Sequence, residues 1–145
     1  MMHKELLWST CSNCKNDTNK LVQNKLISLK PPFCLYLNGD VGAGKTWISK
    51  KLAYYYKVKN LISSSYLKFT TYIGDNNEKI IHADFFYLPN NYEFFFENIY
   101  DEVDDYTILL IEWATQILPL KIMQYSIDIK IKNLDQREIR CFRLI

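Results

Sequence analysis

The feature that most constrains this chain is the stretch LYLNGDVGAGKTWISKKL, residues 35–52. The chain has only four glycines, and three of them fall within positions 39–44. The run FCLYL before them is apolar throughout, as in a strand buried on both faces of a sheet. After the glycines, Ile48, Leu52 and Tyr56 recur every four residues, which is the stripe of a helix that packs on a sheet. The stretch therefore predicts a strand, a glycine loop and a helix.

The glycine loop matches the pattern GxxxxGK[ST] from Gly39 to Thr46. Backbone N–H groups can curl around polyphosphate oxygens where Cβ atoms are missing, and the next helix directs its positive dipole end at the same anion. In such a loop Lys45 would bridge the β- and γ-phosphates, and Thr46 would offer its hydroxyl to Mg2+. The alternative is a glycine turn followed by an incidental lysine.

A magnesium site needs a second anchor, normally an acidic residue at the end of a buried strand. Glu112, which closes TILLIE, fits this role, although it also fits a solvent-facing carboxylate at a strand end. Asp84 follows another apolar run and is predicted to orient the attacking water or contact the metal through water, with a turn cap as the alternative. His82 shares a strand face with Asp84, as a packed or a functional histidine.

The rest of the chain predicts further helices and strands. Residues 16–29 space apolar side chains helically, with Asp17 or Thr18 as N-cap and Lys30, Pro31 and Pro32 as the end. Further expected elements are a hairpin of residues 67–73 and 78–88 around Gly74, a short helix or irregular segment at 91–103, a buried strand at 106–113 and a hairpin at 125–144. We expect one α/β domain over residues 1–145, a P-loop NTPase-type domain with a mixed central β-sheet flanked by helices.

Composition and the N-terminal sequence bear on binding partners and on location. The net charge is only +2 with dispersed basic residues, so composition gives no electrostatic case for direct nucleic-acid binding. The longest apolar run, YTILLIEW, is far shorter than the roughly 20 residues of a membrane-spanning helix. The N-terminal residues lack the pattern of a secretory signal, so we expect a cytoplasmic protein. Cys11 and Cys14 have no second cysteine or histidine pair, so no structural zinc is expected.

The predicted ligands are ATP and Mg2+. Adenine is favoured because no NKxD guanine signature occurs, and Mg2+ is expected from Thr46 and Glu112. The only arginines are Arg137, Arg140 and Arg143, so the chain lacks an internal arginine finger unless the tail folds back, and unaided hydrolysis should be slow. Arg137 and the segment before Thr18 are candidate neighbours of adenine. The predicted nucleotide-binding residues are Gly39, Asp40, Val41, Gly42, Ala43, Gly44, Lys45, Thr46, Trp47 and Arg137.

Four segments in order, LNGDVGAGKTWISKKL, LISSSYLKF, HADFFYL and LLIEW, resemble the bacterial TsaE (YjeE) ATPase family of tRNA threonylcarbamoyladenosine synthesis. The resemblance implies an αβ domain whose mixed sheet carries the loop. It also implies an ATPase that works with two partner proteins, TsaB and TsaD, which attach a threonylcarbamoyl group to an adenosine beside the anticodon. The role on tRNA would therefore be indirect.

The resemblance also implies residue roles. Thr46 and Glu112 would be magnesium ligands, Asp84 the catalytic or metal-proximal carboxylate, and Trp113 part of a functional IEW element. Ser63 and Ser65 would belong to a switch segment, SPT[FY] in the family. The catalytic set is then Lys45, Asp84 and Glu112.

The chain departs from the family pattern at several positions. Ser64 replaces the switch proline, Phe86 and Tyr87 replace the YR of HxDxYRL, and Ala114 replaces a common proline. Asn98 lies near a usual glycine, where asparagine tolerates a left-handed backbone better than most residues.

Two other functions use the same loop. A small-molecule or nucleotide kinase normally needs an arginine-rich lid, which this chain lacks. A nucleotide-dependent binding switch with little hydrolysis would fit the altered switch segment.

Overall fold

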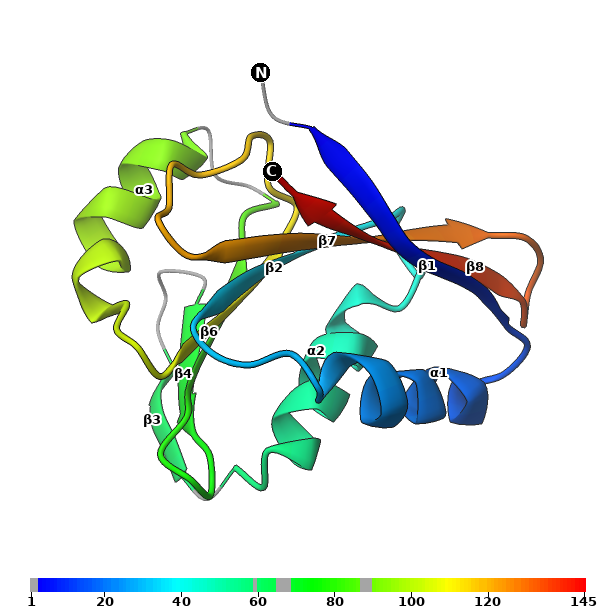
Figure 1. Ribbon diagram of the computed structural model, residues 1–145, viewed down its shortest axis with the longest axis horizontal. Helices are drawn as coiled ribbons and strands as arrows, with labels where there is room; N and C mark the ends of the chain where they lie inside the picture. Colours follow the sequence, from blue (N-terminus) through cyan, green and yellow to red (C-terminus); the bar gives the residue numbers. More distant parts are fainter. Residues whose placement is uncertain (1–2, 59, 65–68, 87–89) are drawn as a thin grey trace.

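The computed structural model describes residues 3–58, 60–64, 69–86 and 90–145. Its centre is a mixed eight-stranded sheet in the order β1-β8-β7-β2-β6-β5-β4-β3 (Figure 1). The strands are β1 (Lys4–Ser12), β2 (Phe33–Asn38), β3 (Asn60–Ser64), β4 (Phe69–Ile73), β5 (Lys79–Asp84), β6 (Thr107–Glu112), β7 (Met123–Ile131) and β8 (Arg137–Leu144). The pairs β2–β6, β2–β7 and β5–β6 are parallel, and the other pairs are antiparallel. The predicted mixed sheet flanked by helices is confirmed.

Helices cover both faces of this sheet. They are α1 (Lys15–Leu21), which continues as the π-helical turn η1 (Val22–Leu26), then α2 (Lys45–Tyr55), α3 (Asn91–Asn98) and the 3-10 turn η2 (Tyr100–Glu102). Along β2, Phe33, Leu35 and Leu37 pack with α1, η1 and α2, whereas Cys34 and Tyr36 pack in a second cluster with α3. This alternation follows from the period of two in a strand, so β2 is buried on both faces as predicted.

Both predicted hairpins are confirmed. β4 and β5 pair antiparallel across a turn in which the Gly74 N–H donates to the Glu78 carbonyl at 2.8 Å. β7 and β8 pair antiparallel along nearly their whole length. The strand expected at 106–113 is β6, and every residue of it is buried. β5 ends at Asp84, earlier than predicted, and residues 67–68 and 87–88 of the predicted hairpin lie outside the described residues.

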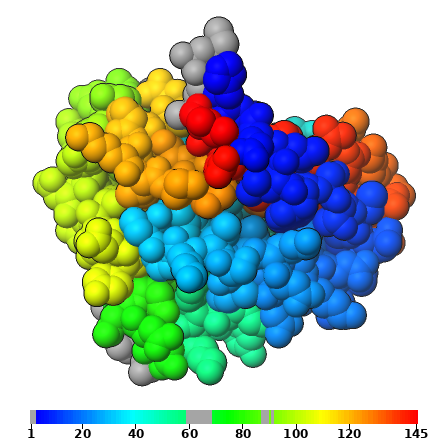
Figure 2. Space-filling model, viewed as in Figure 1, coloured from blue at the N-terminus to red at the C-terminus, as the bar shows by residue number. Residues whose placement is uncertain are grey.

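Two strands were not predicted. β3 pairs with β4 at the edge of the sheet, and β1 pairs with β8 at the opposite edge. Most residues of β1 are exposed, so its position depends on backbone hydrogen bonds to β8 rather than on an apolar face. In Figure 2 the blue N-terminal strand lies against the red C-terminal residues. Its sequence therefore carries little of the alternation that reveals a half-buried strand.

The first helix begins earlier than predicted. Its N-cap is Cys14, and the Asp17 carboxylate instead accepts a hydrogen bond from the Asn13 N–H at 3.0 Å. The regular α-helix also ends at Leu21, where the π-helical turn begins, rather than continuing to residue 29. The expected N-caps Asp17 and Thr18 were therefore wrong. None of the described helices is both long and apolar enough to cross a membrane.

The cysteines fall into two groups. Cys11 and Cys14 are exposed, whereas Cys34 and Cys141 are buried in β2 and β8. Burial raises the pKa of the Cys34 thiol to about 12 and that of Cys141 to about 12. Within the described ranges, no three His, Cys, Asp or Glu side chains are grouped to hold a metal.

We predict that Leu35→Ala lowers the free energy of unfolding by about 2–5 kcal/mol, because Leu35 is fully buried in the core between β2 and the helices. Leu134→Ala is the matched control. Leu134 is 88% exposed, so its truncation should change stability by less than about 0.5 kcal/mol. Urea unfolding measures both values, and equal losses would contradict this assignment of the core.

Candidate functional site

The glycine loop joins β2 to α2 at the carboxyl end of β2. The Ala43 N–H donates to the Asp40 carbonyl at 3.0 Å and closes a turn within the loop. Gly42 and Gly44 have φ angles of +83° and +116°, where an L side chain is strained. An added Cβ at Gly39 would lie 2.9 Å from the Ala43 Cβ and 2.9 Å from the Ile129 carbonyl oxygen. The loop thus needs glycine for backbone conformation and for close approach.

The amino end of α2 opens directly from this loop. Gly44 is its N-cap and brings no side chain to cap the first turn. The backbone N–H groups of the first turn of a helix have no partner within the helix, and the helix dipole favours an anion there. The end of α2 therefore suits a phosphate group.

Lys45 lies inside the loop and is 5% exposed. Its Nζ donates to the Gly39 carbonyl and, at 3.1 Å, to the Asp40 carbonyl. Burial lowers the pKa of the Lys45 ammonium, while the negative charges of Glu112, Asp40 and Asp84 act in the opposite direction. The ammonium group stands where an anion held by the loop would meet it.

Thr46 and Glu112 meet although they are far apart in the sequence. The Thr46 Oγ1 donates to the two carboxylate oxygens of Glu112, at 2.9 and 3.1 Å. Glu112 closes β6 opposite Leu37 of the parallel strand β2, and it is 3% exposed. The solvent-facing alternative for Glu112 is therefore wrong, because the side chain is buried against the loop.

His82 is a partner of this carboxylate that the sequence did not reveal. Its Nε2 contacts the Glu112 Oε2, while Thr46 holds the same carboxylate from α2. The sequence places His82 two residues before the end of one apolar run and Glu112 at the end of another. It does not show that these runs are the neighbouring parallel strands β5 and β6, which brings the two side chains together. His82 therefore fixes one side of the Glu112 carboxylate.

Asp84 lies at the carboxyl end of β5, next to Glu112 at the carboxyl end of β6. It pairs in register with Glu112, and its side chain is exposed. Its Oδ1 accepts a hydrogen bond from the Phe86 N–H at 3.0 Å, which is the turn contact of the alternative interpretation. The structure thus places Asp84 beside Glu112 and also gives it a structural contact.

Trp113 has an unusual backbone conformation, with a φ of +59°. Such a conformation is uncommon for a bulky residue and costs about 1–3 kcal/mol. The Lys45 Nζ lies 4.0 Å from the centroid of its ring, and the centroids of the Trp113 and Phe86 rings are 4.7 Å apart. The indole therefore packs against the loop lysine.

A cavity of about 280 Å3 adjoins the loop on the side of α1 and β8. Its walls include Gly42–Gly44 and Trp47, together with Ser12, Cys14, Lys15, Leu134 and Arg137. The Trp47 Nε1 donates to the Asn19 Oδ1 at 2.8 Å, and the Lys15 Nζ lies 4.8 Å from the indole centroid. The structure thus brings Arg137 and the segment before Thr18 to one cavity.

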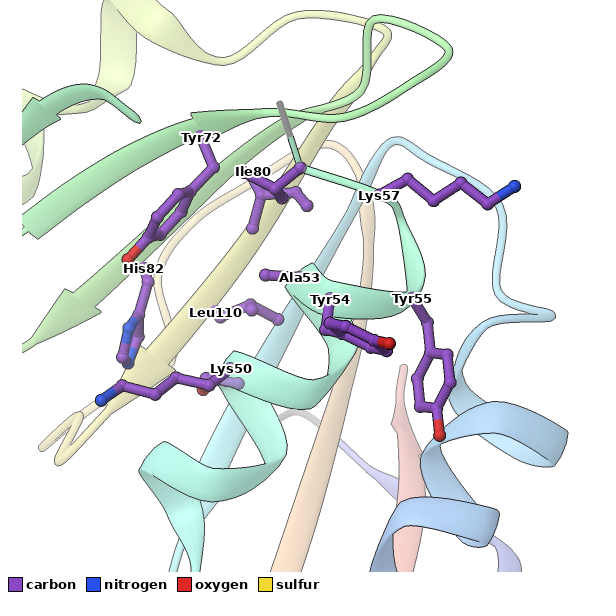
Figure 3. Close-up of a pocket in the computed structure, with 11 residues that line it drawn as sticks. Lys50, Ala53, Tyr54, Tyr55, Lys57, Tyr72, Ile80, His82 and Leu110 are labelled. Atoms are coloured by element: carbon purple, nitrogen blue, oxygen red, sulfur yellow. The ribbon is translucent and has the colours of Figure 1, made fainter. Parts of the chain in front are cut away.

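A larger, mainly apolar hollow of about 540 Å3 lies on the other side of α2. In Figure 3 Tyr72 and His82 line its wall on the strands, and Ala53 and Tyr54 belong to the helical wall. His82 therefore links this hollow to Glu112. No pattern in the sequence indicated it, because its walls come from separate strands and a helix.

The loop, the buried acidic strand end and the fold can be compared with known proteins. The family described as "Threonylcarbamoyl adenosine biosynthesis protein TsaE" matches residues 12–140. This chain belongs to the TsaE family. A tRNA threonylcarbamoyladenosine biosynthesis protein TsaE from Aquifex aeolicus is 32% identical over 142 residues, which are 96% of this chain and 98% of that protein. The TsaE protein of Rickettsia conorii is 30% identical over 131 residues, 89% of this chain and 73% of that protein.

A solved structure supports the fold. The crystal structure of Bacillus subtilus YdiB superposes with a TM-score of 0.69, covering 99% of this chain and 87% of that chain at 24% identity. The similarity therefore extends over the whole sheet, including the unpredicted strand β1.

Several positions that depart from the TsaE pattern are placed by the structure. Asn98 is the last residue of α3, so its backbone is not left-handed, and its Nδ2 donates to the Phe94 carbonyl at 3.0 Å. The argument for Asn98 from left-handed geometry was therefore wrong. Ala114 packs at the edge of the α3 cluster. Ser65 and Tyr87 lie outside the described residues, whereas Ser63 and Ser64 belong to the backbone of β3.

We predict that Gly39→Ala destabilises the protein more than Gly42→Ala. At Gly39, an added Cβ causes both overpacking and backbone strain, so the free energy of unfolding should fall by about 2–5 kcal/mol. At Gly42, an added Cβ meets no heavy atom of the described chain within 4 Å, so only backbone strain remains and the loss should be about 1–2 kcal/mol. Urea unfolding of both variants tests this difference. A smaller loss for Gly39→Ala would show that the loop can move away from Ile129.

Proposed function

We propose that this chain is a magnesium-dependent ATPase that supports threonylcarbamoyladenosine modification of tRNA together with TsaB and TsaD partners. The single observation that carries the proposal is the contact of Thr46 with the buried carboxylate of Glu112 beside the glycine loop. Membership of the TsaE family supplies the pathway. The same residues are proposed to act as one P-loop domain over the whole chain.

The loop residues are proposed to bind the polyphosphate. Backbone N–H groups of the loop and of the first turn of α2 donate to phosphate oxygens, and Gly39 and Gly42 allow the backbone to curl around them. Lys45 exchanges its contacts with the Gly39 and Asp40 carbonyls for the phosphates. Asp40, Val41, Ala43 and Gly44 complete the loop.

Thr46 and Glu112 fit a magnesium site. Mg2+ prefers hard oxygen ligands and is commonly held by one or two protein groups together with phosphates and water. The hydroxyl of Thr46 and the carboxylate of Glu112 already lie within hydrogen-bond distance. Thr46 and Glu112 would hold the ion, which would supply positive charge to neutralise the phosphates. His82 holds the Glu112 carboxylate in place.

Asp84 is proposed as the carboxylate that orients the attacking water. It is exposed, and it neighbours Glu112 across the paired ends of β5 and β6. A carboxylate at that position accepts a proton or a hydrogen bond from water. Trp113 and the β3 residue Ser63, with Ser65, are proposed to belong to elements that respond to the nucleotide or to partners.

The nucleoside is proposed to occupy the cavity between the loop, Trp47 and Arg137. Its volume of about 280 Å3 and its mixture of apolar and polar walls suit a base. The Arg137 guanidinium donates to backbone carbonyls, and these contacts occupy the group that an arginine finger would direct at a transferred phosphoryl group. Slow unaided hydrolysis therefore remains our expectation.

We predict that Glu112→Gln lowers magnesium-dependent ATP turnover by about 100-fold while ATP still binds, because the amide lacks the charge that holds the ion. Lys45→Ala should abolish ATP binding altogether. Calorimetric titration and phosphate release measure these two properties separately. Glu97→Gln, an exposed change on α3, is the matched control. Unchanged turnover in Glu112→Gln would exclude Glu112 as the metal ligand.

Asp84→Asn should lower kcat by about 100-fold with little change in ATP affinity, because asparagine still accepts the Phe86 N–H bond but is not a base. Asp105→Asn, an exposed surface change, serves as control. The kinetic constants of both variants under steady-state conditions provide the measurement. A loss confined to affinity would contradict a catalytic role for Asp84.

A further inference from the structure

We propose that Arg137 is a positioning residue that fixes the phosphate loop to the turn between β7 and β8. The inference rests on the proposed function and deepens it, because it assigns Arg137 to the loop rather than to the base. Arg137 lies 94 residues from Ala43 and 95 from Gly42 in the sequence, yet its guanidinium spans the space between the loop and this turn.

The Arg137 guanidinium donates hydrogen bonds to both the loop and the turn between β7 and β8. On the loop side, its Nε donates to the Ala43 carbonyl and its Nη2 to the Gly42 carbonyl, each at 3.2 Å. On the turn side, its Nη1 donates to the carbonyls of Asn133 at 2.9 Å, Leu134 at 3.2 Å and Gln136 at 3.1 Å. One side chain therefore bridges two backbone segments that line the same cavity.

These contacts orient the peptide groups that would face a phosphate. In a trans peptide the carbonyl and the N–H point in opposite directions. By holding the Ala43 carbonyl toward the turn between β7 and β8, Arg137 directs the Gly44 N–H away from that turn. Gly44 has a φ of +116° and leads into α2, so this N–H belongs to the donors at the amino end of that helix.

Arginine suits this task better than lysine. A guanidinium presents five N–H donors in a rigid planar fork, whereas an ammonium group is a compact point charge on a flexible stem. Each of the five hydrogen bonds of Arg137 ends on an uncharged carbonyl oxygen. The positive charge of Arg137 thus stays beside the loop and adds to its attraction for an anion.

The test compares Arg137→Gln and Arg137→Lys with the matched control Arg143→Gln. Arg143 lies on the same strand but pairs with Glu5 at the far end. Calorimetric titrations use two probes, ATP and inorganic triphosphate, each with Mg2+, and thermal unfolding verifies that the variants fold. The triphosphate has no base, so it reports the loop alone.

The expected result is that Arg137→Gln raises the Kd of ATP and of triphosphate by the same factor, about tenfold, or about 1.4 kcal/mol. Arg137→Lys should restore only part of this loss, and Arg143→Gln should change either Kd by less than about twofold. A loss for ATP without a loss for triphosphate would overturn the inference and assign Arg137 to the base. An equal loss in Arg143→Gln would overturn it as well.

The two proposals fail in different ways. If the parent protein binds ATP and Arg137→Gln binds it equally well, the positioning role is wrong and the proposed function stands. If the parent protein binds neither ATP nor triphosphate, the proposed function is wrong, and the role of Arg137 at a phosphate site is wrong with it.

Discussion

The parallel pairing of β2 with β6 is the constraint on which the candidate site depends. The register sets Leu37 opposite Glu112, so the carboxyl ends of the two strands lie side by side. The glycine loop follows the carboxyl end of β2, and the buried carboxylate of Glu112 lies at the carboxyl end of β6. Parallel strands buried on both faces are held by apolar packing from two layers, which makes this register difficult to shift. A functional contact between α2 and β6 thus follows from the packing of the core.

The candidate site residues contact one another directly. Lys45 donates to loop carbonyls, and Thr46 donates to Glu112. Under the proposed function, Lys45 would hold the phosphates of ATP, and Thr46 and Glu112 would hold Mg2+. Buried charged groups are costly unless paired, so these contacts stabilise the loop. The left-handed backbone of Trp113, directly after Glu112, stores strain at the same place.

Sequence alone could predict the strand, the loop and the helix because motif, glycine content and periodicity agree over residues 33–56. It could also predict that Glu112 ends a buried strand. It could not predict β1, whose exposed side chains carry no pattern and whose position depends on backbone bonds to β8. The contacts of Arg137 with the loop could not be predicted either. They are made to backbone carbonyls, which every residue has, so the residue types of the loop give no sign of them.

The most direct test of the central claim is ATP hydrolysis by the purified protein with Mg2+, measured alone and then with TsaB and TsaD from the same source. The account predicts slow turnover alone and marked stimulation by the partners. Among the described residues, Arg137 donates to backbone carbonyls, Arg140 pairs with Glu138 and Arg143 pairs with Glu5, so none is placed as an arginine finger for the phosphoryl group. Intact ATP binding without any stimulation would contradict it and indicate a binding switch with little hydrolysis.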